Sequence, residues 1–309
     1  MNSFNKTIIF ISTHIITKAV ISEYNKMKKL KNYDVILAID NTNIKSEYDK
    51  RITKKQYFGT TVECFFFDSK VHDELQLPWF HYNSLSNNFA EIMWYNSDFR
   101  FYYFRKYFPD YEYYWQFEYD IFCNGDSYQS FFDKYSNRTE DALLLEFRTE
   151  AHNGPWAWSN NIDWIYKQTN IYGSFFPIVK LTGKAIDFLY QQRLKHKYLY
   201  NSIYKKKNDN NFLWIFCECF VPTELINNGF TIYRMVENNI TLNEIDLTTD
   251  RLFEIPDNKL YHPVKGQFIE RINKLNNEIK LQKEKNYELE NNIIFKIMFK
   301  IVQLFRKNK

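Results

Sequence analysis

The chain has 309 residues, of which 45% are hydrophobic and 19% aromatic, with seven glycines and seven prolines. This composition can bury a large core and excludes a disordered, collagen-like or low-complexity protein. The formal net charge is +4, but residues 293–309 contribute +5, which leaves −1 for the rest of the chain. Because a nucleic-acid-binding protein would carry its basic excess on the folded body, we expect no nucleic-acid partner.

Short apolar runs rich in β-branched or aromatic residues predict the strands of the domain. They are residues 7–12, 35–39, 62–67, 113–117, 142–147 and 177–181. Helices are predicted over residues 16–30, over 96–108, where Pro109 ends the helix, and over 183–195. Residues 201–211 are polar and charged and predict a surface loop. Alternating strands and helices indicate one α/β domain over residues 1–266.

The end of the chain has a different character. Residues 267–292 combine many charges with a few apolar residues at helical spacing, which predicts a helical stalk or short coiled coil. These apolar positions are too few to predict or exclude a homo-oligomer. Residues 293–309 interleave lysines with isoleucine and phenylalanine, which predicts an amphipathic helix. The segment is too short to span a bilayer of about 30 Å, but its cations would bind an anionic membrane surface. Packing into the domain or against a dimer partner is the alternative.

No signal-peptide pattern precedes the first apolar run, so we expect a cytoplasmic protein, peripheral on the inner face of the cell membrane. The four cysteines have no CxxC spacing and are expected to be reduced thiols rather than zinc ligands.

Several polar residues in apolar surroundings are candidates for chemistry. Glu118 and Asp120 follow an apolar strand with their carboxylates on one face, where Mg²⁺ or Mn²⁺ would relieve their repulsion. Lysine partners or helix capping would do so equally well. Glu218 lies in an apolar segment that would raise its pKa and suit it to proton transfer, unless it is a buried structural acid. His262 precedes Pro263, which favours an extended backbone. The polar end of the second strand, at Asp40, marks the expected ligand crevice.

The chain contains neither a P-loop nor a GxGxxG motif. Instead, the order of its elements, with Glu-x-Asp after an aromatic strand, resembles that of nucleotide-sugar glycosyltransferases of the GT-A fold. Residues 113–125 (YYWQFEYDIFCNG) and 217–229 (CECFVPTELINNG) are similar to glycosyltransferase-like proteins of fungi and of bacterial surface-polysaccharide loci. The resemblance spans residues 5–266 and implies a GT-A-like, Rossmann-like mixed sheet flanked by helices.

The resemblance also implies roles for the candidate residues. Glu118 and Asp120 match the metal-binding Asp-x-Asp motif, with Asp120 the more direct ligand of Mn²⁺ or Mg²⁺, because Glu118 departs from the commonest form. His262 matches the C-terminal metal-binding histidine, and Glu218 matches the base that deprotonates the acceptor hydroxyl. Substrate contacts are implied for Thr13, His14, Asp40, Asn41 and Glu118 with the nucleotide-sugar, and for Lys265 with its diphosphate. Trp156 and Trp158 could stack on a sugar face of the acceptor, with a place in the core as the alternative.

The function expected from these residues is transfer of a sugar from a nucleotide-sugar to a glycan or glycolipid acceptor. Such a metal-dependent enzyme would act in surface polysaccharide or lipooligosaccharide synthesis, and Glu218 favours inversion at the anomeric carbon. Two alternatives use the same fold. A nucleotidyl- or phospho-group transferase would use the same carboxylates, and a membrane-associated scaffold would use none of them.

Overall fold

The computed structural model describes most of the region predicted to be the domain. The described residues are 7–44, 50–81, 84–86, 88–149, 162, 164–166, 171–207, 213–235, 240–247 and 259–264, together with 281, 283, 285 and 287. Trp156, Trp158, Lys265 and residues 293–309 lie outside this set, so the assignments made for them remain predictions. No helix of the described part is long and apolar enough to cross a membrane.

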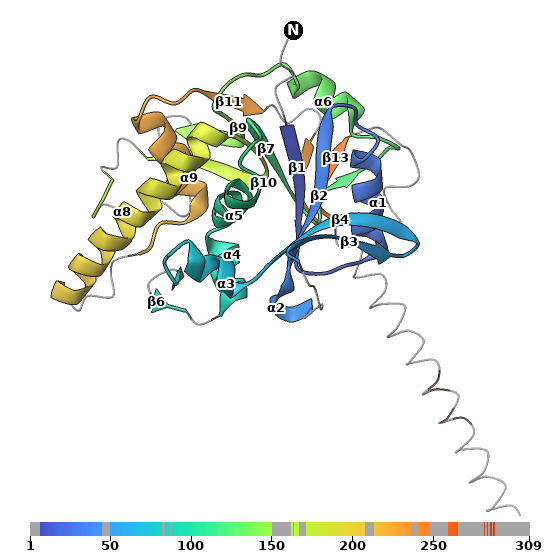
Figure 1. Ribbon diagram of the computed structural model, residues 1–309, viewed down its shortest axis with the longest axis horizontal. Coiled ribbons are helices and arrows are strands. Elements are labelled where there is room, and N and C mark those ends of the chain that lie inside the picture. Colours follow the sequence, from blue (N-terminus) through green and yellow to red (C-terminus); the bar gives the residue numbers. More distant parts are fainter. Residues whose placement is uncertain are drawn as a thin grey trace, which may run out of the picture.

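A mixed eight-stranded sheet forms the centre of the fold (Figure 1), in the order β11-β9-β10-β7-β1-β2-β4-β3. In that order the strands are Ile232–Met235, Ala142–Thr149, Tyr172–Thr182, Tyr113–Glu118, Thr7–Thr13, Tyr33–Asp40, Thr60–Phe67 and Ile52–Tyr57. Strand β1 pairs in parallel with both β2 and β7, and β2 pairs in parallel with β4. The antiparallel strand β10 joins β7 to β9. The mixed α/β sheet expected from the sequence is therefore confirmed.

Helices cover both faces of the sheet. Helices α1 (Lys18–Met27) and α6 (Gln129–Tyr135) pack on one face, and α4 (Phe89–Tyr95), α5 (Phe99–Tyr107), α8 (Gly183–Lys207) and α9 (Cys217–Asn227) pack on the other. Two short helices, α2 (Asn41–Ile44) and α3 (Ser69–Glu74), follow β2 and β4. A small sheet joins β12 (Ile240–Leu247), β13 (Leu260–Val264) and β8 (Phe122–Cys123), and a two-stranded ribbon joins β5 (Phe80–His81) and β6 (Ser84–Leu85).

The central strands are apolar on both sides because helices cover both. Along β1, Ile8 and Phe10 point into the core under α5, whereas Ile9 and Ile11 point into the core under α1. The Phe10 ring stacks on Phe104 of α5 with a centroid separation of 3.8 Å. The aromatic residues thus fill the two cores. Because these strands are buried on both faces, their sequences are continuous apolar runs.

All the predicted strands are present, but one helix prediction and one loop prediction need correction. The helix predicted over 96–108 is α5 alone, because the chain turns at Asn96–Asp98 after the separate helix α4. The surface loop predicted over 201–211 is wrong at its start, since α8 continues to Lys207. Residues 201–207 contain no proline or glycine, and their lysines are good helix formers, so the helix propagates through a polar sequence.

Candidate functional site

Two carboxylates lie at the end of strand β7, in the middle of the sheet's carboxyl edge. Glu118 is its last residue, and a turn closed by the hydrogen bond from Ile121 N to Glu118 O (3.1 Å) brings Asp120 to the same place. Asp120 is buried, with 7% of its surface exposed. Because β7 lies between β1 and β10, the pair sits where the parallel part of the sheet meets the antiparallel strand.

His262 reaches these carboxylates through strand pairing across a long stretch of sequence. Strand β13 pairs antiparallel with β8, and Val264 N donates a hydrogen bond to Asp120 O at 2.9 Å. Strand β8 is in turn fastened to α1, where Cys123 N donates to Glu23 Oε2 at 3.0 Å. The position of His262 therefore depends on the pairing of β13 with β8 and on the contact of β8 with α1.

Glu118, Asp120 and His262 form a group that could hold a metal ion, with one ligand atom from each lying within 4.8 Å of the others. His262 Nε2 is 3.4 Å from Asp120 Oδ1 and 3.6 Å from Glu118 Oε2. Two ligands of one Mg²⁺, each at about 2.1 Å, are separated by at most about 4 Å. An imidazole with two carboxylates also suits Mn²⁺. The residues therefore fit a divalent cation with small side-chain adjustments.

The charges of the two carboxylates change the pKa of His262. Burial by itself would lower this pKa, but the hydrogen bonds and charges of Asp120 and Glu118 outweigh burial and raise it to about 9. Two carboxylates thus attract a cation strongly enough to hold a proton on a buried imidazole. The same field would attract a divalent metal.

Arg100 of α5 is a site residue that the sequence analysis did not find. Its Nη1 lies 3.4 Å from Glu118 Oε1, so it is an ion-pair partner of one carboxylate of the group. Its side chain is 17% exposed and lines the cleft described next. Only an arginine placed within an aromatic segment could have drawn attention to it, and that signal did not say which way the side chain points.

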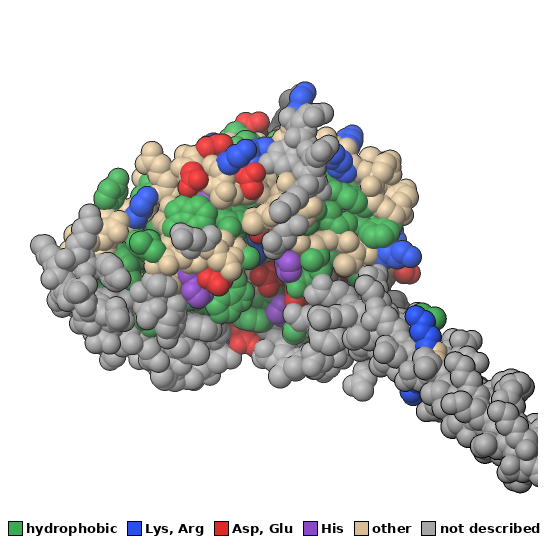
Figure 2. All heavy atoms as spheres, turned by 90° about the horizontal axis from the view of Figure 1, so that it is seen from below, with side chains coloured by type: hydrophobic (Ala, Val, Ile, Leu, Met, Phe, Trp, Pro, Cys, Tyr) green, Lys and Arg blue, Asp and Glu red, His purple; other side chains and the backbone are tan. Residues whose placement is uncertain are grey.

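These residues line one cleft of about 520 Å³ at the carboxyl edge of the sheet. Figure 2, which views this side of the molecule, shows acidic and histidine side chains gathered around a hollow. The residues predicted from the sequence that line the cleft are Thr13, His14, Asp40, Glu118, Asp120, Glu218 and His262. Asn41 does not line it and instead begins the short helix α2.

The strand ends of β1 and β2 form one end of the cleft. Asp40 Oδ1 accepts a hydrogen bond from Thr42 N at 2.9 Å and so caps the start of α2. Thr13 Oγ1 accepts from Ile15 N at 3.1 Å, which fixes the turn that follows β1. The His14 ring packs edge-on against Tyr119, with centroids 4.7 Å apart.

Glu218 lies on the opposite side, in the first turn of α9. It is 8% exposed, and the helix N-terminus favours a negative charge at this position. Phe216, in an extended conformation, forms the N-cap. Because α9 packs against β10, Glu218 stands beyond β7 and its carboxylates, on the side away from β1 and β2.

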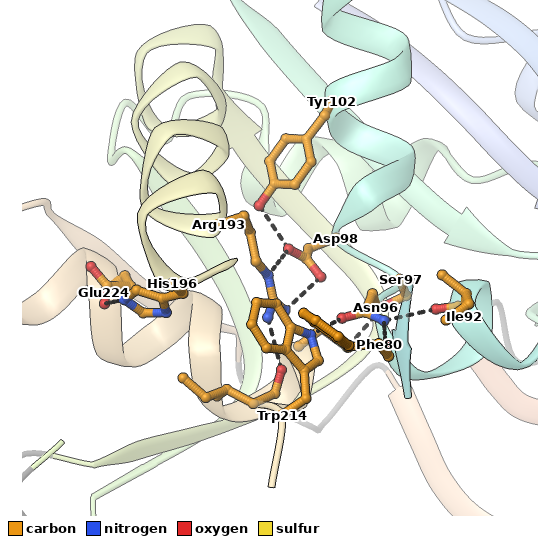
Figure 3. Close-up of polar contacts among 12 residues, drawn as sticks. Phe80, Ile92, Asn96, Ser97, Asp98, Tyr102, Arg193, His196, Trp214 and Glu224 are labelled. Carbon is orange, nitrogen blue, oxygen red and sulfur yellow. Dashed lines mark hydrogen bonds and ion pairs between the residues drawn. The ribbon is translucent and has the colours of Figure 1, made fainter. Parts of the chain in front are cut away.

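A buried ion pair holds this helix start in place (Figure 3). The guanidinium of Arg193, from α8, donates Nε and Nη2 to the two carboxylate oxygens of Asp98, each at 2.9 Å. Its Nη1 donates to Ile215 O at 2.8 Å, three residues before Glu218. Both side chains are fully buried. Arg193 thereby joins α8, the start of α5 and the segment leading into α9.

No protein-family model and no curated protein matches the sequence. Among solved structures, mouse xyloside xylosyltransferase 1 in its apo form is similar in fold, with a TM-score of 0.42 and 9% sequence identity. The match covers 83% of this chain and 96% of the mouse chain. At this level of similarity, the function has to be inferred from the residues of the cleft.

Proposed function

We propose that the protein is a divalent-metal-dependent glycosyltransferase with a GT-A-like fold, which uses a nucleoside-diphosphate sugar as donor. The observation that carries the proposal is the pairing, within one cleft, of the Glu118–Asp120–His262 group with the separate carboxylate of Glu218. The first group suits a cation on a diphosphate, and the second suits a base for a hydroxyl.

Each residue then has a defined part in the reaction. Asp120 and His262 bind the cation, and Glu118, paired with Arg100, lies beside them. When bound, Mn²⁺ or Mg²⁺ supplies neutralisation of the negative charge that develops on the leaving diphosphate. Thr13, His14 and Asp40 contact the nucleotide at the ends of β1 and β2.

Glu218 acts on the acceptor. Its carboxylate accepts the hydroxyl proton while the hydroxyl oxygen forms a bond to the anomeric carbon of the donor. The bond from that carbon to the diphosphate oxygen breaks, and a nucleoside diphosphate leaves. Attack from the side opposite the diphosphate inverts the anomeric configuration. Base catalysis of this kind contributes about 10²- to 10⁴-fold to a rate.

The remaining assignments extend this proposal to residues outside the described set. Lys265 would contact the diphosphate, Trp156 and Trp158 the acceptor, and residues 293–309 an anionic membrane that carries a glycolipid acceptor. Asn41, which the structure does describe as the first residue of α2, would act at the edge of the nucleotide site, one residue beyond Asp40. Synthesis of a surface polysaccharide or lipooligosaccharide at the inner face of the membrane is the corresponding cellular role.

The test is a thermal-shift titration with UDP, GDP, CDP and CMP, each with and without Mn²⁺. We expect one nucleoside diphosphate to raise the melting temperature only when metal is present. A ligand at 100 times its dissociation constant adds about 2.7 kcal/mol to the free energy of unfolding, which is readily measured. Release of pyrophosphate from a nucleoside triphosphate, in place of release of a nucleoside diphosphate from a nucleotide-sugar, would identify a nucleotidyltransferase.

The matched variant is Asp120→Asn, which keeps the size of the side chain but removes the charge that attracts the cation. We expect it to lose the metal-dependent part of nucleotide binding, measured by calorimetry, while the protein remains folded. Unchanged metal-dependent binding would contradict the assignment of Asp120 as a ligand.

A further inference from the structure

Trp94, the penultimate residue of α4, exposes its indole inside the cleft. It is 56% exposed, whereas its neighbours Met93 and Tyr95 are each 2% exposed. Of the large apolar side chains that are exposed in the described part of the chain, Trp94 alone lines this cleft. An exposed tryptophan in a concave site is a typical ligand contact, because aromatic side chains prefer to be covered.

The indole belongs to the same wall as Glu218. Its ring packs against Phe216, with centroids 5.6 Å apart, and Phe216 is two residues before Glu218. The link between α4 and this segment is reinforced by Tyr95, whose hydroxyl donates to Trp214 O at 2.7 Å. Trp214 Nε1 in turn donates to Asn96 Oδ1 at 2.8 Å (Figure 3). Trp94 and Glu218 are therefore held in a fixed relation.

The order of the strands places this wall away from the nucleotide end. Asp40 and Thr13 end β2 and β1, the Glu118 carboxylate ends β7, and α9 packs beyond them on β10. Because the indole contacts Phe216, just before α9, a molecule lying on Trp94 would be on the Glu218 side of the cleft. That is the side from which a hydroxyl has to approach the donor sugar.

We propose that Trp94, backed by Phe216, forms the subsite that binds the sugar ring of the acceptor. A pyranose ring has an apolar face of C–H groups that can cover the indole, while the hydroxyls at its rim remain free to reach Glu218. The inference rests on the proposed function and assigns a binding residue to its acceptor. Trp94 sets acceptor binding, and Glu218 performs the proton transfer.

The first experiment observes Trp94 directly by ¹⁹F NMR of protein that carries 5-fluorotryptophan. The Trp94 signal is the one missing from the Trp94→Phe variant. The probes are UDP, GDP and CDP with Mg²⁺, and then lactose, maltose, cellobiose and N,N′-diacetylchitobiose, each with and without the nucleotide that binds. We expect at least one disaccharide to shift the Trp94 signal in a saturable manner.

The second experiment measures affinity with that disaccharide. Trp94→Ala should weaken its binding by about tenfold or more, and Trp94→Phe should restore part of the loss, because a smaller aromatic ring still offers a stacking face. The nucleotide dissociation constant should stay unchanged in both variants. Tyr198→Ala is the matched control, since Tyr198 is 71% exposed on α8 and does not line the cleft.

The outcomes separate this inference from the function on which it rests. A Trp94 signal that shifts with a nucleotide alone would make the indole a base-stacking residue and overturn the acceptor subsite. Metal-dependent nucleotide binding without any response of Trp94 to the disaccharides would also overturn it, while leaving glycosyl transfer intact. Failure of every nucleotide to bind would refute the proposed function, and the disaccharide titration would still decide the sugar subsite.

Discussion

At the scale of single residues, the cleft separates two kinds of carboxylate by their surroundings. Glu118 and Asp120 lie beside a histidine and an arginine, and two carboxylates grouped with an imidazole can hold a divalent cation. Glu218 stands at a helix N-terminus on another wall. Carboxylates with different environments can take different roles in one reaction.

Glu218→Gln tests the proposed base. The amide keeps the size and hydrogen-bonding capacity of the side chain but cannot accept the hydroxyl proton. We expect nucleotide-sugar binding to be unchanged and the turnover number to fall by about 10²- to 10⁴-fold. Calorimetry and a coupled assay for nucleoside diphosphate release measure the two quantities, and wild-type turnover would remove Glu218 from this role.

The burial of His72 leads to a prediction of how the free energy of unfolding depends on pH. It is fully buried, its Nδ1 lies 2.8 Å from the Tyr103 hydroxyl, and burial lowers its pKa from 6.5 to about 4. Below pH 6.5 the unfolded chain binds a proton that the folded chain excludes. The free energy of unfolding should therefore fall by about 3 kcal/mol as the pH decreases from 6.5 to 4.

The matched variant is His72→Asn, which retains a polar atom near Tyr103 but does not titrate. Urea unfolding at pH 7.5, 6, 5 and 4 should give a shallower loss of stability for the variant than for the wild type. Parallel curves would show that His72 is not the group responsible.

At the scale of elements, the cleft wall that carries Glu218 depends on contacts between three helices. Arg193 connects the Asp98 carboxylate before α5 with the Ile215 carbonyl before α9, and Tyr102 adds a 2.7 Å hydrogen bond to Asp98. The Arg193 guanidinium also lies 3.7 Å from the centre of the Phe220 ring. These contacts fix the distance between the first turn of α5, which carries Arg100, and Glu218.

Arg193→Met should therefore destabilise the protein strongly, because it leaves Asp98 buried without a compensating charge. We expect a loss of about 3–5 kcal/mol. The control is Lys106→Met, which removes a partly exposed pair (2.8 Å) between Lys106 of α5 and Glu74 of α3 and should cost about 1 kcal/mol or less. Chemical denaturation measures both, and equal effects would contradict a structural role specific to the buried pair.

At the scale of the whole molecule, the predicted membrane helix is a separable property. Residues 293–309 hold the cations that give the chain its positive charge. Their deletion should release the protein from vesicles of phosphatidylglycerol and phosphatidylcholine in a flotation assay, since each cation contributes about 1 kcal/mol near an anionic surface. Vesicles of phosphatidylcholine alone are the control, and continued flotation of the truncated chain would contradict the assignment.

The sequence by itself indicated most strands of the central sheet and several residues of the cleft. Strands buried on both faces must be continuous apolar runs, so they were readable without any knowledge of their partners. Glu118, Asp120 and Glu218 were noticeable because charged residues within apolar segments need a compensating partner or a function. The polar continuation of α8 was missed because helix propagation does not require an apolar pattern.

Only the tertiary structure decided which residues meet. His262 comes within 3.4 Å of Asp120 because β13 pairs with β8, a pairing between strands that share no local sequence signal. The packing of the helices decides what the side chains of Arg100, Arg193 and Trp94 contact. Whether a side chain faces a cleft, a core or solvent depends on contacts between segments far apart in the chain, and local sequence does not encode those contacts.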